Sequence, residues 1–260
     1  MKLFASDFDG TFYFNGKKQD VYLKNILSVK EFQKNHKFAI VTGRDANSII
    51  HNLSQHGLKP DYIACFNGGL IYDNQMNVLY SNRLKIDFEK LMELLDEQNA
   101  QMISICSQER GFFRQFRENK ENEAFTVQLY KEMNVQATSD FKELDKNHIY
   151  MASIVCDNEE HAEKVCAKIN ELGFECSAYV NRKYIDVVGK NASKKSAVEM
   201  IAKHAKSDEI YTIGDSFNDI NMIEYFNGFA VEDSNIEVKR VAKQIVKSVN
   251  HAISLLIQQE

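Results

Sequence analysis

Two pairs of aspartates in this 260-residue sequence follow short apolar runs. Asp7 and Asp9 come directly after residues 2–6, and Asp215 and Asp219 follow residues 209–213. Such runs predict buried strands, and open α/β sheets bind ligands at the carboxyl ends of their strands. Carboxylates in these places can act as acids and bases on a bound molecule. The alternative is a polar turn, since Asp-Gly and Asp caps are common turn chemistry.

A hydroxyl and a lysine stand between the two acidic pairs. Thr42 follows the apolar run 38–41, and Lys194 opens a predicted helix. Alone, Thr42 could start a helix or a turn, and Lys194 could be a solvated charge. A lysine at this end of a helix opposes the helix dipole, however, so its position asks for another reason.

Strands alternate with helices around these motifs, which predicts right-handed crossovers and a parallel sheet covered on both faces. The fold class is therefore α/β. A hairpin is expected across 70–80, turning at Asp73-Asn74. We predict strands over 2–6, 38–41, 62–66, 209–213 and 228–231, and helices over 21–35, 46–55, 196–205, 219–225 and 236–241.

The middle of the chain has a different pattern, with an antiparallel component typical of an α+β unit. The stretch between Thr42 and Lys194 is also far longer than the roughly 30 residues of a βαβ unit. We therefore predict a core over 1–82 and 187–260, with an inserted α+β domain over 83–186. No structure is assigned to 108–123. Helices are expected over 88–99 and 159–172, strands over 102–107, 150–156, 174–180 and 184–188, and a turn over 181–183.

Composition excludes several classes of protein. Lys and Arg number 32 against 37 Asp and Glu, and this mild acidity argues against a nucleic-acid or membrane partner. No apolar run approaches the roughly 18–20 residues of a membrane span. Asp7 interrupts the N-terminus too early for a signal peptide. We expect a cytoplasmic protein whose five cysteines are reduced thiols.

The four motifs together resemble those of the haloacid dehalogenase (HAD) superfamily, and most of all its Cof-like sugar-phosphate phosphatases. Asn67-Gly68-Gly69 is similar to the segment that precedes the inserted type-II (subtype B) cap of that group. Three places depart from the family pattern, namely Phe12, Lys195 and Val231-Glu232-Asp233-Ser234. The resemblance is carried by Asp7-Phe8-Asp9-Gly10-Thr11, Thr42-Gly43-Arg44, Lys194 and Gly214-Asp215-Ser216-Phe217-Asn218-Asp219.

The resemblance implies a HAD-like Rossmannoid core and a Mg²⁺-dependent phosphomonoesterase that hydrolyses a small phosphorylated metabolite. Asp7 would be the nucleophile that forms an aspartyl-phosphate, and Asp9 the general acid and base. The ion would be held by the Asp7 side chain, the Asp9 main-chain carbonyl and Asp215, with Asp219 as ligand or orienter. The residues implied to bind the phosphate are Thr42, Gly43, Lys194 and Asn218.

Other functions stay open at this point. A phosphomutase of the same fold and a non-catalytic metabolite-binding regulatory protein are the alternatives. A sugar phosphate is the expected substrate, although a nucleotide, flavin mononucleotide or pyridoxal phosphate fits the motifs as well. Arg44, Arg182 and Lys183 are either contacts for the leaving group or solvated charges. We expect a monomer or a weak homodimer.

Overall fold

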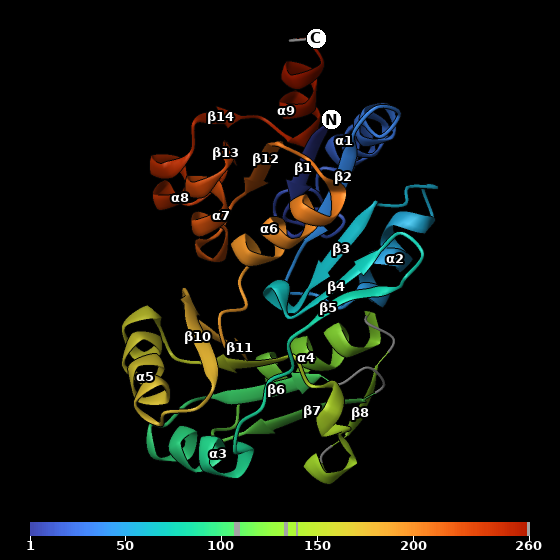
Figure 1. The fold of residues 1–260 in the computed structure, drawn as a ribbon. Helices are drawn as coiled ribbons and strands as arrows, with labels where there is room; N and C mark the ends of the chain where they lie inside the picture. Colours follow the sequence, from blue (N-terminus) through green and yellow to red (C-terminus); the bar gives the residue numbers. More distant parts are fainter. Residues whose placement is uncertain (107–109, 133–134, 139, 259–260) are drawn as a thin grey trace. The chain divides into compact units, whose positions relative to one another are not determined.

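The computed structural model describes residues 1–106, 110–132, 135–138 and 140–258. They form two compact units, one made of residues 1–80 with 193–260 and the other of residues 81–192 (Figure 1). Each unit has its own sheet, and the expected α/β class with an inserted α+β unit is confirmed. The domain boundary expected at residue 186 would cut the strand Tyr184–Gly189, whereas the second unit includes this strand whole and ends at Ala192.

The first unit is built on an eight-stranded sheet. Its central strand, β1 (Lys2–Ser6), is buried along its whole length and pairs in parallel with both of its neighbours, β12 and β2. Parallel pairing continues outward to β14 on one side and β3 on the other, whereas β4 is antiparallel to β3. The strands lie in the order β14 (Gln244–Val246), β13 (Asn227–Val231), β12 (Glu209–Gly214), β1, β2 (Lys37–Val41), β3 (Tyr62–Cys65), β4 (Leu70–Asp73) and β5 (Val78–Ser81).

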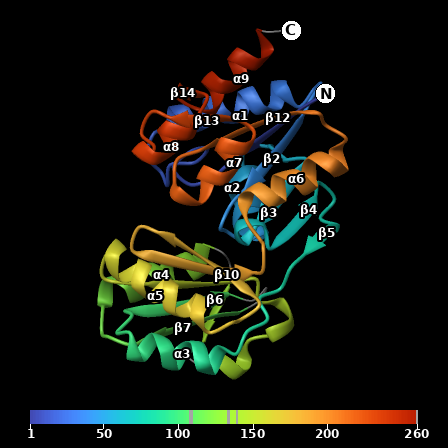
Figure 2. The same cartoon turned by 60° about the vertical axis from the view of Figure 1, so that its left-hand side comes forward.

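Helices cover both faces of this sheet (Figure 2). Side chains alternate along β1, so Leu3 and Ala5 join a core cluster with residues of α6 and α7, whereas the Phe4 ring lies 6.0 Å from that of Phe32 on α1. The helices and turns of this unit are α1 (Gln19–Phe32), α2 (Ala46–Ser54), η1 (Phe66–Gly68), α6 (Lys194–Ala205), η4 (Phe217–Asp219), α7 (Ile220–Tyr225), α8 (Ile236–Val241) and α9 (Val249–Ile257).

The second unit carries a six-stranded mixed sheet. Its pairs are antiparallel, except that β8 runs parallel to β7. Residues of α3 and α5 pack with the sheet in one apolar cluster. The strands lie in the order β10 (Cys176–Asn181), β11 (Tyr184–Gly189), β9 (Met151–Val155), β6 (Met102–Cys106), β7 (Arg110–Gln115) and β8 (Gln136–Thr138), with helices and turns α3 (Phe88–Glu97), α4 (Lys120–Glu132), η2 (Phe141–Glu143), η3 (Lys146–His148) and α5 (Glu159–Glu171).

Several predicted boundaries move. Helix α1 begins at Gln19 and ends at Phe32, earlier than expected at both ends. Strand β3 ends at Cys65, because Phe66 and Asn67 adopt positive φ and start the turn η1. Helix α6 begins at Lys194 rather than residue 196, since Ser193 caps it through the backbone N–H of Ser196. The predicted strand over 102–107 is observed over Met102–Cys106, and residue 107 lies outside the described residues.

Other elements had no counterpart in the sequence prediction. The unassigned stretch 108–123 includes β7 and the start of α4, and no element was predicted for β8, β14 or α9. Helix α4 contacts the second sheet through Tyr130 and Thr126. The Tyr130 ring packs with Phe113 and Cys106 while its hydroxyl donates to Phe112 O at 2.7 Å, and Thr126 Oγ1 lies 3.7 Å from the Met102 sulfur.

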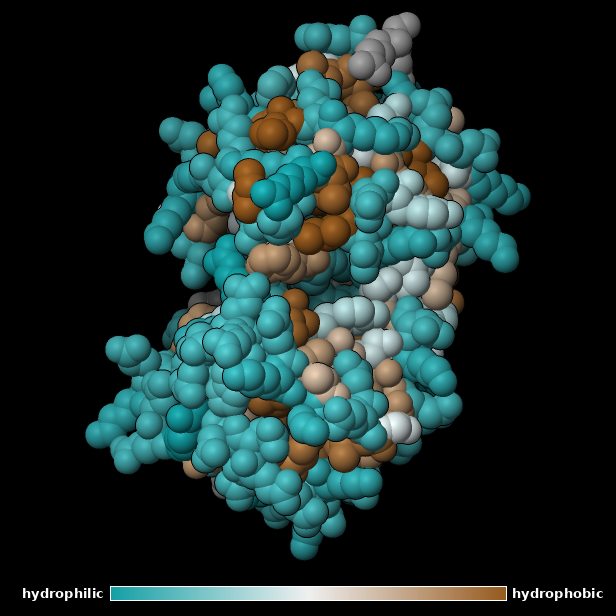
Figure 3. All heavy atoms as spheres, turned by 90° about the vertical axis from the view of Figure 1, so that its left-hand side faces the viewer, coloured by the Kyte–Doolittle hydropathy of each residue, from teal (hydrophilic) through white to brown (hydrophobic). Residues whose placement is uncertain are grey.

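Most large apolar side chains of the described chain are buried. On the face drawn in Figure 3, hydrophilic residues make up most of the surface and hydrophobic ones gather in small groups. Among the described residues, no helix combines the length and the apolar character that a bilayer span requires.

Asn25 connects three segments of the first unit through hydrogen bonds of its side chain. Its buried amide donates to Phe12 O at 3.0 Å and accepts from Asn250 N at 2.9 Å, which ties α1 to the loop after β1 and to the start of α9. We expect Asn25→Leu to lower the free energy of unfolding by at least about 2 kcal/mol, because it leaves both partners unsatisfied. Urea unfolding measures the change, and the exposed Asn35→Leu should change stability by less than about 0.5 kcal/mol. Equal effects would contradict this role.

Candidate active site

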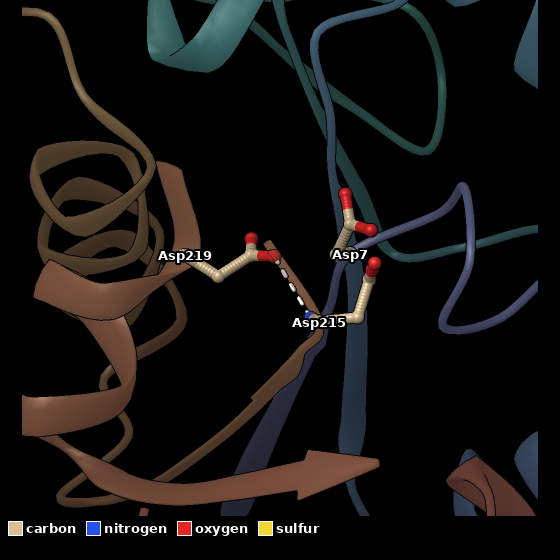
Figure 4. Close-up of side chains that lie close together, drawn as sticks. All are labelled: Asp7, Asp215 and Asp219. Carbon is tan, nitrogen blue, oxygen red and sulfur yellow. Dashed lines mark hydrogen bonds between the residues drawn. The ribbon is translucent and has the colours of Figure 1, made fainter. Parts of the chain in front are cut away.

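The acidic motifs meet where β1 and β12 end. These parallel neighbours are in register, with Ser6 opposite Ile213, and Asp7 N donates to Ile213 O at 3.0 Å. Asp7 and Asp215 therefore leave adjacent strands at the same edge of the sheet, and their carboxylates lie close to that of Asp219 (Figure 4). The sheet extends from β1 to β2 on one side and to β12 on the other, which is the switch point where α/β sheets bind ligands.

Asp215 is fixed by two hydroxyls. Thr11 Oγ1 donates to its Oδ1 at 2.8 Å, and Ser216 Oγ donates to its Oδ2 at 3.1 Å. Gly10 allows this approach, since it has a φ of +82° and a Cβ there would lie 2.8 Å from Asp215 Oδ2. The sequence prediction identified Asp215 but missed the role of Thr11, although the hydroxyl belongs to the same motif as Asp7.

Asp219 is fully buried and is held by the backbone around it. The N–H groups of Asp215 and Ser216 donate to its Oδ2 at 3.0 and 2.9 Å, the first of which is drawn in Figure 4. Gly214 makes room for the carboxyl group, because a Cβ there would lie 2.4 Å from Asp219 Cγ. This turn leaves Asp219 Oδ1 to face Lys194.

Lys194 is the cation of the site. Its ammonium donates to Asp7 Oδ1 at 2.6 Å and to Asp219 Oδ1 at 2.7 Å, and its side chain is only 2% exposed. The N-terminal end of a helix dipole repels a positive charge, but the attraction of these two carboxylates offsets that repulsion and stabilises a lysine in the first turn of α6. These ion pairs explain why a lysine stands at this helix start, and its role in binding phosphate stays a prediction.

Burial sets the electrostatics of the cluster. It raises the pKa of Asp7 well above its usual value, and the negative charges of Asp219 and Asp215 add to the rise, while Lys194 opposes it. Burial and then Asp219 also raise the pKa of Asp215, against the hydrogen bond from Thr11. Burial alone would lower the pKa of Lys194, but the charges of Asp219 and Asp7 outweigh it and raise that pKa. One ammonium therefore does not offset the negative charge of three carboxylates.

The cluster fits a divalent cation. Asp7, Asp215 and Asp219 each offer one oxygen, and these oxygens lie within 4.8 Å of one another. Hard oxygen donors with surplus negative charge suit Mg²⁺, which binds through one or two carboxylates and keeps several waters. The carboxylate of Asp9 is not a member of this cluster within the described residues. A contact from its main-chain carbonyl stays a prediction.

Thr42 and its neighbours form a second polar loop, after β2. Thr42 is buried, and its hydroxyl accepts from Arg44 N at 3.1 Å. Its carbonyl accepts from Asn67 N at 2.9 Å, and the Asn67 amide oxygen lies 3.5 Å from where a Cβ on Gly43 would be. Asn218 Nδ2 donates to Asn67 Oδ1 at 3.2 Å, and its own Oδ1 is buried without a partner. Asn67 thus brings together Thr42, Gly43 and Asn218.

Asp9 has a different environment from Asp7. Arg44 Nε and Nη2 donate to its Oδ2 and Oδ1, both at 2.6 Å, and its side chain is 47% exposed. The turn after Asp7 separates the two aspartates, since Gly10 N donates to Tyr13 O and reverses the chain. The contact between Asp9 and Arg44 was missed by the sequence prediction, and no local pattern joins residues on two different loops.

Comparison with known proteins gives a family. A model of the haloacid dehalogenase-like hydrolases matches residues 4–255. The chain is 25% identical over 274 residues to a Bacillus subtilis protein named "Putative phosphatase YxeH", with 98% of each chain covered, and 26% identical to an uncharacterised Mycoplasma capricolum protein, covering 95% of this chain and 97% of the other.

Solved structures share the fold. The structure of BT4131, described as a HAD subclass IIB sugar phosphatase, has a TM-score of 0.78 at 18% identity and covers 100% of this chain and 99% of its own. A haloacid dehalogenase-like hydrolase from B. subtilis has a TM-score of 0.80 at 18% identity, covering 98% and 100%. The resemblance seen in the motifs is confirmed by a match over nearly the whole chain. This chain belongs to the haloacid dehalogenase-like hydrolases.

Proposed function

We propose that this hydrolase is a Mg²⁺-dependent phosphatase of a small phosphorylated metabolite, and that the metabolite is a sugar phosphate. The observation that carries the proposal is the carboxylate cluster of Asp7, Asp215 and Asp219 around Lys194 at the switch point of the sheet. The similarity to YxeH and the shared fold with BT4131 support the phosphatase activity, and the name of BT4131 favours a sugar phosphate.

Asp7 is the proposed nucleophile. Its carboxylate attacks phosphorus, the bond from phosphorus to the leaving oxygen breaks, and Asp9 gives its proton to that oxygen. Asp9 then takes a proton from water as the water attacks the aspartyl-phosphate, which releases inorganic phosphate and restores Asp7. A bound Mg²⁺ supplies charge neutralisation for the phosphoryl group and its carboxylate ligands.

The other residues hold the phosphoryl group in the proposed mechanism. Lys194 keeps Asp7 in place and offsets negative charge that develops on the phosphoryl oxygens. The Thr42 hydroxyl donates a hydrogen bond to a phosphoryl oxygen. Gly43 has no side chain, so the backbone of this loop can approach the phosphoryl group closely. Asn218 presents a polar side chain whose buried Oδ1 has no protein partner.

The nucleophile is tested with Asp7→Asn and p-nitrophenyl phosphate. We expect Mg²⁺-dependent hydrolysis by the wild type, abolished by EDTA, and a loss of at least about a thousandfold in kcat for the variant. The exposed Asp208→Asn is the matched control and should keep full activity. Retained activity in Asp7→Asn would exclude this nucleophile. A wild type that binds Mg²⁺ but hydrolyses no phosphate ester would favour the regulatory alternative, and a need for a bisphosphate activator would favour a phosphomutase.

The metal site is tested by thermal unfolding. A ligand that binds only the folded state stabilises it by RT ln(1 + L/Kd), where L is the ligand concentration, so the midpoint of unfolding rises with the logarithm of that concentration once it exceeds Kd. We expect Mg²⁺ to raise the Tm of the wild type and of Asp208→Asn, and to leave that of Asp215→Asn unchanged at the same concentration. An equal rise in Asp215→Asn would place the ion elsewhere.

The contribution of the Lys194 ion pairs to the free energy of unfolding is tested in the absence of metal. Lys194→Met leaves two buried carboxylates without their cation, and we expect it to lower the free energy of unfolding by about 3–5 kcal/mol in EDTA. Lys203→Met, at an exposed position of the same helix, should change it by less than about 0.5 kcal/mol. Similar losses in the two variants, measured by urea unfolding, would show that the ion pairs contribute little.

A further inference from the structure

Arg44 is joined to Asp9 more firmly than a surface ion pair requires. Two guanidinium nitrogens contact the two carboxylate oxygens, both at 2.6 Å. The Arg44 side chain is 13% exposed against 47% for Asp9, so the arginine is the anchored partner and the aspartate the accessible one. Exposed ion pairs add about 0–1 kcal/mol to stability, which makes a purely stabilising role a weak explanation.

Three contacts hold the guanidinium in its plane. Arg44 Nη1 donates to Ser48 Oγ at 3.0 Å, and Ser48 is fully buried on α2. The guanidinium carbon lies 5.5 Å from the ring centroid of Phe8 and 5.9 Å from that of Tyr13, rings which stack at 5.2 Å. Arginine over aromatic faces is attracted by the ring electrons. The loop that carries Asp9 therefore also supplies the two aromatic rings that contact the Arg44 guanidinium.

We propose that Arg44 is a positioning residue that sets the orientation of the Asp9 carboxylate for proton transfer, and that Ser48 holds Arg44 for this task. The proposal rests on the phosphatase function and on Asp9 as its general acid. A guanidinium with two donors can keep one oxygen of Asp9 while the other turns to the leaving oxygen of the substrate. A lysine ammonium is a compact charge without a fixed plane, so it would not set the orientation of the carboxylate in this way.

Two phosphate esters of nearly equal size, compared as substrates, distinguish positioning of Asp9 by Arg44 from binding of the phosphate by Arg44. Phenyl phosphate has a poorer leaving group than p-nitrophenyl phosphate, so protonation by Asp9 matters more for the former. We expect Arg44→Met to lower kcat/KM for phenyl phosphate about a hundredfold, and for p-nitrophenyl phosphate about tenfold or less. Asp9→Asn should show the same imbalance, and Arg240→Met, an exposed arginine of α8, should show no change.

A double-mutant cycle completes the test. If Arg44 acts through Asp9, adding Arg44→Met to Asp9→Asn should cause no more than about a twofold further loss with either ester. Arg44→Lys and Ser48→Ala should show the same imbalance at smaller size, and they carry the test if Arg44→Met does not fold. Equal losses with both esters, or additive losses in the cycle, would overturn the proposal and make Arg44 a phosphate or structural contact. A wild type that hydrolyses neither ester would instead refute the phosphatase function itself.

Discussion

The contact between the Lys194 ammonium and the carboxylates of Asp7 and Asp219 is the interaction on which the first unit depends most. It joins the end of β1, the start of α6 and the turn η4, which are far apart in the sequence. Buried charges are costly unless they are paired and hydrogen-bonded. Since the chain places three carboxylates together, it must supply compensating donors within the same few ångströms, and Lys194 is the charged one among them.

The remaining donors come from the local backbone and from short hydroxyls. Asp219 accepts from two backbone N–H groups, and Asp215 accepts from Thr11 and Ser216. Even so, burial keeps the pKa values of Asp7 and Asp215 raised, although Lys194 opposes the rise at Asp7 and the bond from Thr11 opposes it at Asp215. The oxygens of the three aspartates lie within 4.8 Å of one another, so a bound divalent cation would offset their unfavourable negative charge. Asp9, only two residues from Asp7, is not part of the cluster and is paired with Arg44.

The sequence predicts the parts of the fold that hydrophobic burial determines. Strand β1 is buried along its whole length and β12 at its carboxyl end, so apolar runs reveal them, and the polar residues after them reveal the edge of the sheet. Strand β14 has three residues, of which two are exposed, and α4 packs through Thr126 and Tyr130. Neither has a periodic apolar pattern, so pattern analysis has nothing to detect.

The candidate site divides in the same physical way. Residue types and their place after strands were enough to select Asp7, Thr42 and Asp215, since parallel strands deliver their carboxyl ends to one edge. The pairing of Arg44 with Asp9 was not predictable, because it depends on a turn that reverses the chain and on which way a long side chain points. Lys194 lies between these cases. Its positive charge is unfavourable at the N-terminal end of a helix dipole. A residue that conflicts with the local preference in this way indicates that a contact with a distant part of the chain requires it. Such conflicts between local preference and residue type are therefore the best sequence signal for the contacts that periodicity misses.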